Sequence, residues 1–400
     1  MKNYVEAEEV RLVYSGSHYF ETLERIIDES RTSLHLQTYI FECDETGLHV
    51  VAALKRAAAR GVQVNLMVDA YASFPFSGEA RKELLAAGVR FRTFSPLFSK
   101  ESIFIARRMH HKIVVADKFT GLIGGINIAN KYNTVYGNYA WLDYAVLIKG
   151  EVCEYLHVLC EQFYFRKRPR LLRTWEQASI DNPSTAGLQR FVRFRRNDWI
   201  QRKNEIHKSY TEALLKAENS VTIVASYFLP GNNFRRLLRE AAERGVEITI
   251  IMAGRSDISS MRLAENYLYD FYLRHNIRLF EWTNSVMHGK AMIVDDTWST
   301  IGSYNLNFLS HYVSIELNAD IIDRQFIGEF SKHLHDITQN SCTAVQLDRH
   351  SKQNNPLMKV LRWAAYSFYR ILMAMALRSK RYREKQRIAP FRKTKDQSND

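Results

Sequence analysis

The chain has 400 residues, 46% of them hydrophobic, so it is long enough for two domains or two fused halves with a sizeable core. Its 56 lysines and arginines exceed its 43 aspartates and glutamates, and the formal charge of +13 favours anionic partners such as phosphate esters, nucleic acid or acidic lipid. Four widely spaced cysteines exclude a dense disulfide framework and a Cys-rich zinc site. An acidic N-terminal stretch, and the absence of eighteen consecutive uncharged apolar residues, favour a cytosolic product that does not span a membrane.

The first half of the sequence predicts helices that alternate with short strands. Residues 18–30 (HYFETLERIIDES) predict a helix, and residues 33–41 (SLHLQTYIF) predict an apolar strand. A helix rich in Ala and Arg over residues 48–61 leads to a Val-rich strand over residues 62–69. Another helix and strand follow over residues 81–94. Such alternation is typical of an α/β fold.

The second half repeats this order. A helix, a strand, a helix, a strand and a further helix–strand pair are predicted, in turn, at residues 206–220, 221–230, 232–245, 246–252 and 264–282. The tripeptide RGV stands at residues 60–62 and again at 244–246. This internal repeat predicts two similar α-β-α sandwich lobes with mixed sheets, related by a pseudo-twofold axis. Shared sites are expected at the interface between the lobes.

These patterns divide the chain into four parts. We expect a first lobe over residues 1–165, a basic connecting segment over 166–205, a second lobe over 206–345, and a C-terminal helix and tail over 346–400. The connecting segment contains Pro, Ser and Gly among many arginines. It is compatible with a position near an anionic surface and equally with a solvated linker.

A motif follows the repeated elements in each half. The first copy, residues 109–127, reads MHHKIVVADKFTGLIGGIN, and the second, residues 287–305, reads MHGKAMIVDDTWSTIGSYN. Five positions agree at identical spacing, namely His110 with His288, Lys112 with Lys290, Asp117 with Asp295, Gly124 with Gly302, and Asn127 with Asn305. His111 faces a glycine in the other copy. Because strand side chains alternate in direction, His110 and Lys112 should point to one side and His111 to the other.

The residue types in this motif favour chemistry over packing alone. A repeat can preserve core residues, but His, Lys and Asn are poor core residues and are well suited to holding a phosphate. A phosphodiester needs a nucleophile, an acid for the leaving oxygen, and donors to its non-bridging oxygens. Two imidazoles can supply the first two functions near neutral pH. No HExxH motif, carboxylate cluster or Cys/His spacing indicates a metal.

The pattern HxK, four residues, D, six residues, G[GS]xN, found twice, resembles the phospholipase D superfamily. The resemblance covers nearly the whole chain, and the YIF, RGV, GSYNLN and SIELNADI stretches are similar to the short bacterial cardiolipin synthases of the B type, which lack an N-terminal transmembrane pair. It implies the bilobal phospholipase D-like fold. It further implies a phosphatidyltransferase that needs no metal or other cofactor and that acts peripherally on the cytoplasmic face of the bacterial cell membrane.

The resemblance also implies roles for the motif residues. The catalytic set would be His110, Lys112, Asp117, His288, Lys290 and Asp295. His110 would be the nucleophile that forms a phosphatidyl-histidine and His288 the acid and then the base, although the order could be reversed. Asn127 and Asn305 would bind phosphate together with the lysines.

Other polar residues near the motif have two interpretations each. Asp143 in WLDYAV and Glu316 in SIELNADI are candidates for orienting the histidines, or are ordinary strand-edge carboxylates. We expect Asp117 and Asp295 to bond backbone around a turn more than to take part directly. Gly124, Gly125, Gly302 and Ser303 should let the backbone approach the phosphate closely.

The segment from Pro356 to Leu377 has helical periodicity. Its apolar residues form one stripe, comprising Leu357, Val360, Leu361, Ala364, Phe368, Ile371, Leu372 and Met375, and Lys359, Arg362, Tyr366 and Arg370 fall opposite. A polybasic run, RSKRYREKQR, and a polar tail follow. The helix is either an interfacial anchor on an anionic bilayer, which the polybasic run favours, or a helix packed on the core of the protein.

Three functions remain open. A cardiolipin synthase would transfer a phosphatidyl group to the hydroxyl of phosphatidylglycerol or a related polyol, with phosphatidylglycerol and also phosphatidylethanolamine as substrates and no obligatory nucleic acid. A phosphodiesterase or nuclease of the same superfamily suits the charge equally but gains nothing from an apolar C-terminal stripe. A non-catalytic binding protein would not be expected to keep both motifs. Two motifs in one chain leave no need for a dimer to complete the site.

Overall fold

The computed structural model describes residues 3–74, 76–95, 107–136, 140–165, 189–199, 201, 203–347 and 356–388. Of the expected connecting segment, residues 166–188 lie outside these ranges, and so does the polar tail after residue 388. Within the helix over residues 356–388, the backbone is described throughout, whereas the side chains of the polybasic run are not.

The first half contains the helices and strands expected over residues 18–94, together with further strands and a helix before and after them. Its elements are β1 (Val5–Glu6), β2 (Glu9–Tyr14), α1 (Ser17–Glu29), β3 (Ser33–Thr38), α2 (Glu45–Ala59), β4 (Gln63–Asp69), α3 (Gly78–Ala86), β5 (Arg90–Phe94), β6 (Arg108–Met109), β7 (Lys112–Ala116), β8 (Thr120–Gly124), β9 (Tyr144–Lys149) and α4 (Glu154–Phe165). Helix α2 shows why the boundaries fall where they do, because the Asp44 side chain accepts a hydrogen bond from the Gly47 N–H and caps the first turn.

The second half follows the same plan and adds a long C-terminal helix. Its elements are β10 (Phe191–Asp198), β11 (Lys203–Asn204), α5 (Glu205–Lys216), β12 (Ser220–Ala225), α6 (Asn232–Glu243), β13 (Glu247–Ala253), α7 (Ser259–Tyr267), α8 (Tyr269–Arg274), β14 (Arg278–Trp282), β15 (Lys290–Val294), β16 (Trp298–Gly302), α9 (Phe308–Tyr312), β17 (Ser314–Ile322), α10 (Arg324–Asn340), β18 (Cys342–Ala344) and α12 (Pro356–Ile388). The helix expected after β13 is divided at Leu268 into α7 and α8.

The two halves form two sheets with equivalent strand orders. The first sheet runs β2-β9-β8-β7-β3-β4-β5, and the second contains the corresponding run β10-β17-β16-β15-β12-β13-β14. Within each of these runs, three consecutive strands pair in parallel and the others pair antiparallel. Strand β6 of the first half adds a short parallel pair to β17. The expectation of an α/β protein with mixed sheets is therefore confirmed, and the repeat extends to the order of the strands.

Strand β10 corrects one expectation. Residues 191–198 were assigned to the connecting segment because they are rich in arginine, but they pair along β17 over seven residues and match β2 of the first half. Arg193 is buried because its guanidinium donates to Asp320 on β17 at 2.9 Å and lies over the Tyr4 ring. A buried charge is tolerated when it is paired in this way.

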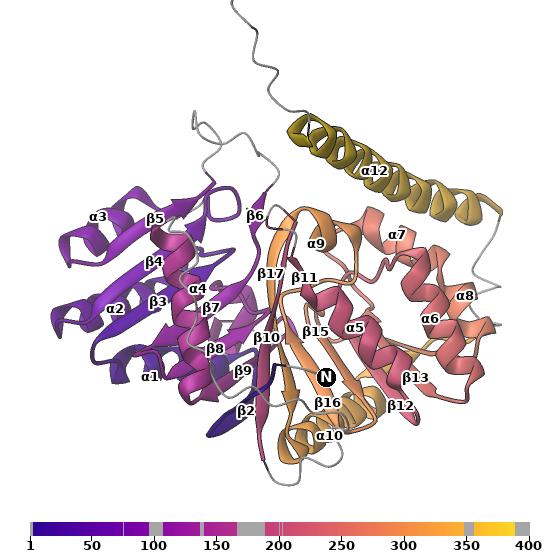
Figure 1. Ribbon diagram of the computed structural model, residues 1–400, viewed down its shortest axis with the longest axis horizontal. Coiled ribbons are helices and arrows are strands. Elements are labelled where there is room, and N and C mark those ends of the chain that lie inside the picture. Colours follow the sequence, from indigo (N-terminus) through magenta and orange to yellow (C-terminus); the bar gives the residue numbers. More distant parts are fainter. Residues whose placement is uncertain are drawn as a thin grey trace, which may run out of the picture.

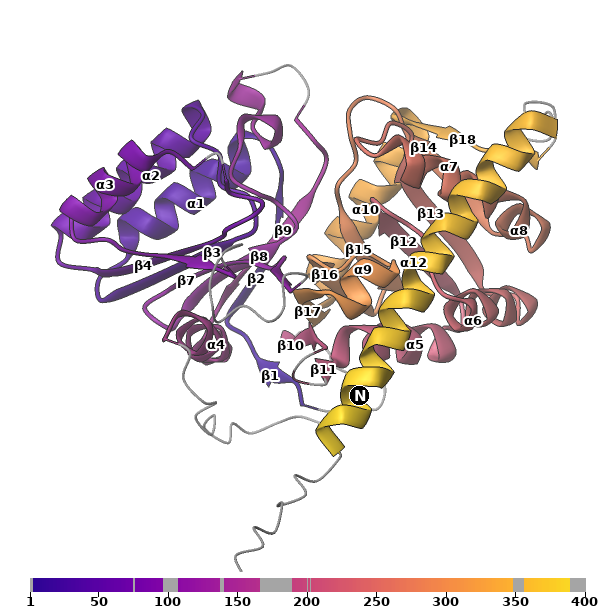
Figure 2. The same ribbon diagram turned by 90° about the horizontal axis from the view of Figure 1, so that it is seen from above.

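The two sheets face each other across a shared core, and helices cover their outer faces. Helices α1, α2 and α3 cover the outer face of the first sheet, and α5 to α8 lie on the outer side of the second, as Figures 1 and 2 show. Between the sheets lies a shared apolar core that contains residues from both halves, such as Ile113 and Val146 from the first and Ile293 and Leu317 from the second. Burial of this face holds the two lobes together and places the two motifs side by side.

Helix α12 crosses the second lobe as a long outer rod (Figures 1 and 2). Its buried residues include Arg362, Tyr366 and Tyr369, which pack toward α6 and α7. The Tyr366 hydroxyl accepts a hydrogen bond from Arg235 at 2.9 Å, and the Tyr369 hydroxyl contacts Ser260 Oγ at 2.9 Å. Across the described part of the chain, no helix combines the length and the apolar character that a membrane crossing needs.

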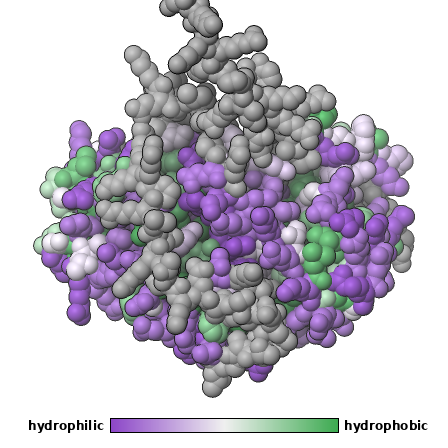
Figure 3. All heavy atoms as spheres, in the orientation of Figure 1, coloured by the Kyte–Doolittle hydropathy of each residue, from purple (hydrophilic) through white to green (hydrophobic). Residues whose placement is uncertain are grey.

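Most of the apolar stripe of α12 faces outward, whereas Leu372 packs, partly buried, against the core of the second lobe. Leu357, Val360, Leu361, Phe368, Ile371 and Met375 are between 44% and 68% exposed. If α12 served only to pack on the protein, these apolar residues would be expected to face the core of the protein. The tyrosine face of α12 packs on the protein, as one of the two interpretations expects, and its apolar face stays exposed; its role as a membrane anchor stays a prediction. Elsewhere, hydrophilic side chains predominate on the face shown in Figure 3.

Candidate active site

Each motif histidine is paired with a carboxylate from the other half of the chain. His110 Nδ1 lies 2.8 Å from Glu316 Oε2, and His288 Nδ1 lies 2.6 Å from Asp143 Oδ2. Glu316 belongs to β17 of the second sheet, whereas Asp143 stands immediately before β9 of the first. Both carboxylates are fully buried. The two pairs are therefore crossed between the lobes.

Backbone hydrogen bonds fix both crossed pairs. The His110 N–H donates to the Ile315 carbonyl at 2.9 Å, and the His288 N–H donates to the Leu142 carbonyl at 2.7 Å. Each accepting residue directly precedes the carboxylate that the same histidine contacts. The geometry is thus set from two sides, through the main chain and through the side chain.

This arrangement leaves the same nitrogen available on both rings. A carboxylate at Nδ1 accepts the Nδ1 proton, so the neutral imidazole carries its lone pair on Nε2. That tautomer is the one that a nucleophile or a general base requires. Asp143 and Glu316, which we expected to be either orienting groups or strand-edge carboxylates, both lie where a histidine-orienting group must be.

The motif lysines lie beside the histidines. Lys112 Nζ donates to the His110 carbonyl at 2.6 Å, and Lys290 Nζ donates to the His288 carbonyl. Lys290 Nζ also lies 3.9 Å from Asp143 Oδ2. Both lysines are buried, which is unusual for this residue type, and the charges of Asp143 and Glu316 act on both of them.

The motif asparagines are held by neighbouring strand ends. Asn127 Oδ1 accepts a hydrogen bond from the Ile40 N–H at 3.1 Å, and Asn305 Oδ1 accepts one from the Ser226 hydroxyl at 2.7 Å. With their oxygens engaged, the amide nitrogens are the groups that can donate. Asn127 Nδ2 donates to the Tyr132 hydroxyl at 2.9 Å, and that hydroxyl lies 3.4 Å from His288 Nδ1.

The electrostatics of the cluster favour an anionic ligand. Burial, followed by the charge of Lys290, lowers the pKa of Lys112 to about 7. Burial also lowers the pKa of Lys290 to about 8 and raises the pKa of Asp143 to about 7. The pKa of His288 is depressed well below its usual value by burial and then by the two lysines. An anion between these cations would favour their charged forms and reverse the depression.

Asp117 and Asp295 require a correction to the catalytic set. Asp117 accepts hydrogen bonds from the backbone N–H groups of Arg31, Thr32 and Ser33 at 2.7–3.0 Å. Asp295 accepts the equivalent three, from residues 218–220, at 2.7–2.9 Å. Each lies seven residues beyond its histidine, roughly 20 Å along a strand. Both aspartates lie far from the reacting groups. Each stabilises a turn, because its carboxylate accepts hydrogen bonds from three backbone N–H groups.

Replacement of Asp295 by alanine should therefore reduce stability and spare chemistry. Three backbone N–H groups would lose a charged acceptor, so the free energy of unfolding should fall by about 1–3 kcal/mol. Denaturant unfolding measures this loss, and turnover measured well below the transition should be unchanged. Asp296→Ala is the matched control, because this neighbour makes a single exposed bond to Ser331. If Asp295→Ala lost turnover but kept its stability, Asp295 would have a direct role in catalysis.

The motif glycines are explained by protein packing, where we expected a close approach to phosphate. A Cβ on Gly125 would lie 2.4 Å from Asp143 Oδ1, and one on Gly124 would lie 2.3 Å from the Tyr144 carbonyl. Gly302 is equally crowded by the strand that carries Glu316. Ser303, at the position of Gly125, donates its hydroxyl to Glu316 at 2.5 Å. These small residues make room for the carboxylates that orient the histidines.

Aromatic residues around the histidines were not identified from the sequence. The Tyr39 ring centroid lies 4.7 Å from that of His110, and Lys112 Nζ lies 5.1 Å from the Tyr39 ring. Tyr132, Trp141 and Tyr227 lie 5.6–6.3 Å from His288. Tyr39 and Tyr227 lie just beyond the ends of β3 and β12, whereas the strands predicted over residues 33–41 and 221–230 include them, so no local signal marked their role.

His111 is confirmed as the neighbour that points away from the cluster, but it is not a surface residue. Its Nε2 lies 2.9 Å from Gln37 Oε1, and the side chain is fully buried. Burial lowers the pKa of His111 to about 3, so it stays neutral. It packs between the first sheet and Phe163 of α4.

Comparison with known proteins agrees with this geometry. The family described as "Cardiolipin synthase, PLD-like domain" matches residues 23–157 and 210–338. Cardiolipin synthase B of Escherichia coli (strain K12) is 34% identical over 349 residues, which cover 85% of this chain and 83% of the relative. Cardiolipin synthase B of Shigella flexneri shows the same identity and coverage.

A solved structure shares the fold. The crystal structure of phosphatidylserine synthase from Haemophilus influenzae Rd KW20 superimposes with a TM-score of 0.71 over 93% of this chain and 96% of that one, at 16% identity. At this identity the likeness concerns the fold alone. Together, the family match over both halves and the 34% identity over most of the sequence show that the chain belongs to the cardiolipin synthase family of phospholipase D-like enzymes.

Proposed function

We propose that this chain is a cardiolipin synthase that acts through His110 and His288 on phosphatidylglycerol. The observation that carries the proposal is the pair of crossed His–carboxylate contacts, which leaves two Nε2 atoms available between two buried lysines. Phosphatidylglycerol supplies both a phosphodiester to be attacked and a hydroxyl to accept the phosphatidyl group. Phosphatidylethanolamine, as a donor, would present the same phosphodiester.

The reaction has two steps. In the first, His110 Nε2 attacks phosphorus, a P–N bond forms, and the P–O bond to glycerol breaks as His288 donates a proton to the departing oxygen. In the second, His288 removes the proton from a hydroxyl of another phosphatidylglycerol. That oxygen attacks phosphorus, the P–N bond breaks, and cardiolipin is released. Each histidine thus ends the cycle in the protonation state in which it began.

The other cluster residues stabilise charge. Lys112, Lys290, Asn127 and Asn305 would donate to the non-bridging oxygens, where negative charge accumulates in the pentacoordinate state. Glu316 and Asp143 would hold the rings and stabilise the imidazolium that forms on either side of the reaction. This cationic environment can perform the charge stabilisation that metal ions perform in other phosphoryl-transfer sites.

A peripheral position on the membrane accompanies this activity. The exposed apolar stripe of α12 would enter the interfacial region of the bilayer, and the polybasic sequence over residues 378–387 would lie against anionic headgroups. We expect the contact to be with the cytoplasmic face of the bacterial cell membrane, where a protein made in the cytosol meets anionic phospholipids. The helix would therefore hold the enzyme where its substrates are.

Charging the stripe should detach the enzyme from lipid. In the triple variant Val360→Glu, Phe368→Glu and Ile371→Glu, binding to phosphatidylglycerol vesicles should weaken by roughly 10²–10³-fold, because three large apolar side chains no longer leave water. Vesicle flotation measures the partition.

The control is a triple variant of Leu48, Leu85 and Leu215 to Glu, which makes the same charge change at residues about equally exposed elsewhere. The stripe variant should lose more binding than this control. Equal losses would mean that net charge alone attracts the protein to lipid and that α12 is not the contact.

Lipid turnover tests the function directly. Purified protein would be incubated with phosphatidylglycerol vesicles, with and without phosphatidylethanolamine, and the products followed by mass spectrometry. Cardiolipin is the expected product. Phosphatidic acid alone would indicate a phospholipase, and no lipid turnover, with cleavage of nucleic acid, would replace the proposal with a nuclease.

A further inference from the structure

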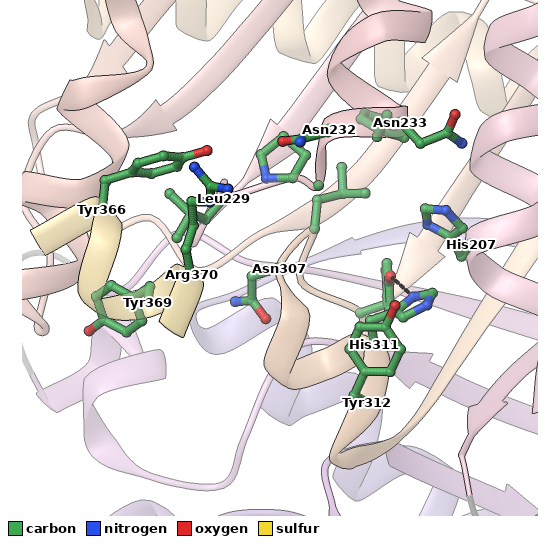
Figure 4. Close-up of a pocket in the computed structure, with 15 residues that line it drawn as sticks. His207, Leu229, Asn232, Asn233, Asn307, His311, Tyr312, Tyr366, Tyr369 and Arg370 are labelled. Carbon is green, nitrogen blue, oxygen red and sulfur yellow. Dashed lines mark hydrogen bonds between the residues drawn. The ribbon is translucent and has the colours of Figure 1, made fainter. Parts of the chain in front are cut away.

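A second concave site lies beside the histidine cluster. A pocket of about 310 Å³, open on one side, lies between the second lobe and α12. Figure 4 shows its walls, with Tyr366, Tyr369 and Arg370 of α12 on one side and His207 and His311 opposite. The remaining wall comes from two short segments, residues 229–234 and 304–307. None of the roles described above uses this space.

The same two segments connect the pocket to the motif. Ser226 holds Asn305, and three residues after Ser226 the chain reaches Leu229, which lines the pocket. Leu306, next to Asn305, lines it too, and the Leu229 N–H donates to the Leu306 carbonyl at 3.1 Å. The pocket is therefore lined by residues that adjoin, in sequence and by hydrogen bonds, the groups that hold Asn305 of the second motif.

The interior of the pocket is suited to an apolar ligand. Several polar groups of its wall already have partners in the protein: the Tyr304 hydroxyl contacts His311 Nδ1 at 3.0 Å, and the Asn307 Oδ1 accepts from the Ser310 N–H at 3.1 Å. The hydroxyls of Tyr366 and Tyr369 are engaged by Arg235 and Ser260. The carbon faces of these rings line the pocket together with Leu229, Pro230, Phe234 and Leu306. The lining also includes the polar residues His207, Asn232, Asn233, Tyr312 and Arg370, but most of its exposed surface is apolar, which favours a hydrocarbon over a polyol.

The size of the pocket restricts the ligand further. About 310 Å³ is near the lower end of ligand pockets, which run from about 300 to 1,000 Å³. It can hold one hydrocarbon chain and not a whole two-chain phospholipid. The α12 wall also carries the outward stripe, so the pocket adjoins the surface that would contact the bilayer.

We propose that this pocket is an acyl-chain subsite, which takes one fatty acyl chain of the phospholipid whose phosphate lies between His110 and His288. The inference rests on the proposed function and deepens it, since it assigns a place for the lipid tail. Helix α12 thereby has two roles, because its outer face contacts the membrane and its inner face recognises the lipid drawn from it.

The substitution Gly231→Trp tests the subsite. Gly231 lines the pocket, its φ of −66° suits any residue, and a Cβ there meets no atom within 4 Å, so the backbone accepts a side chain at this position. The variant should raise the KM for dioleoyl phosphatidylglycerol roughly tenfold or more, because methylene groups of the chain lose their buried contacts. Turnover of dihexanoyl phosphatidylglycerol, presented in the same detergent, should change little.

Two further measurements keep the result interpretable. Gly78→Trp, which adds the same side chain in open space at the start of α3 in the other lobe, should leave both substrates unaffected. A phosphatidylglycerol bearing a diazirine at mid-chain should, on irradiation, label residues 229–234 or the 366–370 turn of α12 in the parent protein, and mass spectrometry locates the label.

Each outcome is decisive. An unchanged ratio of the two KM values in Gly231→Trp, an equal loss for both lipids, or labelling confined to other segments would overturn the subsite and leave the cardiolipin synthase proposal standing. Absence of cardiolipin from the parent itself would instead remove the proposed function on which the subsite rests.

Discussion

Replacing either His110 or His288 by alanine is expected to lower cardiolipin formation by about 10⁴-fold or more. The loss is large because each ring has a chemical role that no neighbouring group can take over, and removal of one member of such a unit disables the whole. Initial rates of cardiolipin release from phosphatidylglycerol, measured by mass spectrometry, give the comparison.

The two variants should differ in one respect. If His110 is the nucleophile, His288→Ala can still form a phosphatidyl-enzyme slowly, and acid-labile radioactivity from labelled lipid should remain on the protein. His110→Ala should carry none. The reverse pattern would exchange the two roles.

His111→Gln is the matched control, because this histidine is adjacent in sequence yet contacts Gln37 on the other side of the strand. It should lower stability more than activity. A loss of turnover as deep as that of His110→Ala would mean that the chemistry had been assigned to the wrong histidine.

Neutralising the carboxylates, by Glu316→Gln or Asp143→Asn, is expected to lower kcat by roughly 10²–10⁴-fold. An amide at Nδ1 can favour the wrong tautomer, and it no longer stabilises the imidazolium. The amide is nearly isosteric, so folding should persist. The pH profile should also change, because the histidine loses an anion that favours its charged form.

The crossed geometry gives this prediction a sharper test. In protein labelled with ¹⁵N-histidine, Glu316→Gln should alter the ring nitrogen shifts of His110, and Asp143→Asn those of His288. In each case the substitution lies in one lobe and the affected histidine in the other. If Glu316→Gln perturbed His288 and spared His110, each carboxylate would serve the histidine of its own half, and the crossed arrangement would be wrong.

Local pattern predicted much of the fold. The helices and strands from residue 17 to residue 94 follow their expected order, since the spacing of apolar residues is a property of the segment itself. Strand β10 was missed because its arginines look solvated until Asp320, 127 residues away, is placed beside Arg193. A buried ion pair between distant segments leaves no local signal, although the alternation in FVRFRRND was available.

The sequence predicted which residues the candidate site contains better than it predicted how they are arranged. The repeat identified both histidines, both lysines and both asparagines, because two copies at equal spacing mark the positions that matter. It could not tell which carboxylate meets which histidine, since that depends on how two sheets pack across a seam. For α12 the pattern showed two faces, but the hydroxyl partners at Arg235 and Ser260 decide that the tyrosine face turns inward.

The crossed pairs have a consequence for how this protein could have arisen. Each half carries a histidine and a carboxylate that pair only with those of the other half, so a single half could form both pairs only by associating with another copy of itself. Joining two halves in one polypeptide replaces that encounter by a high effective concentration. It also frees the two sites from being identical, and the surroundings have diverged: Tyr39 accompanies His110, whereas Tyr132 and Trp141 accompany His288. Two halves in one polypeptide can therefore give the two histidines different surroundings and different roles, which two identical copies could not.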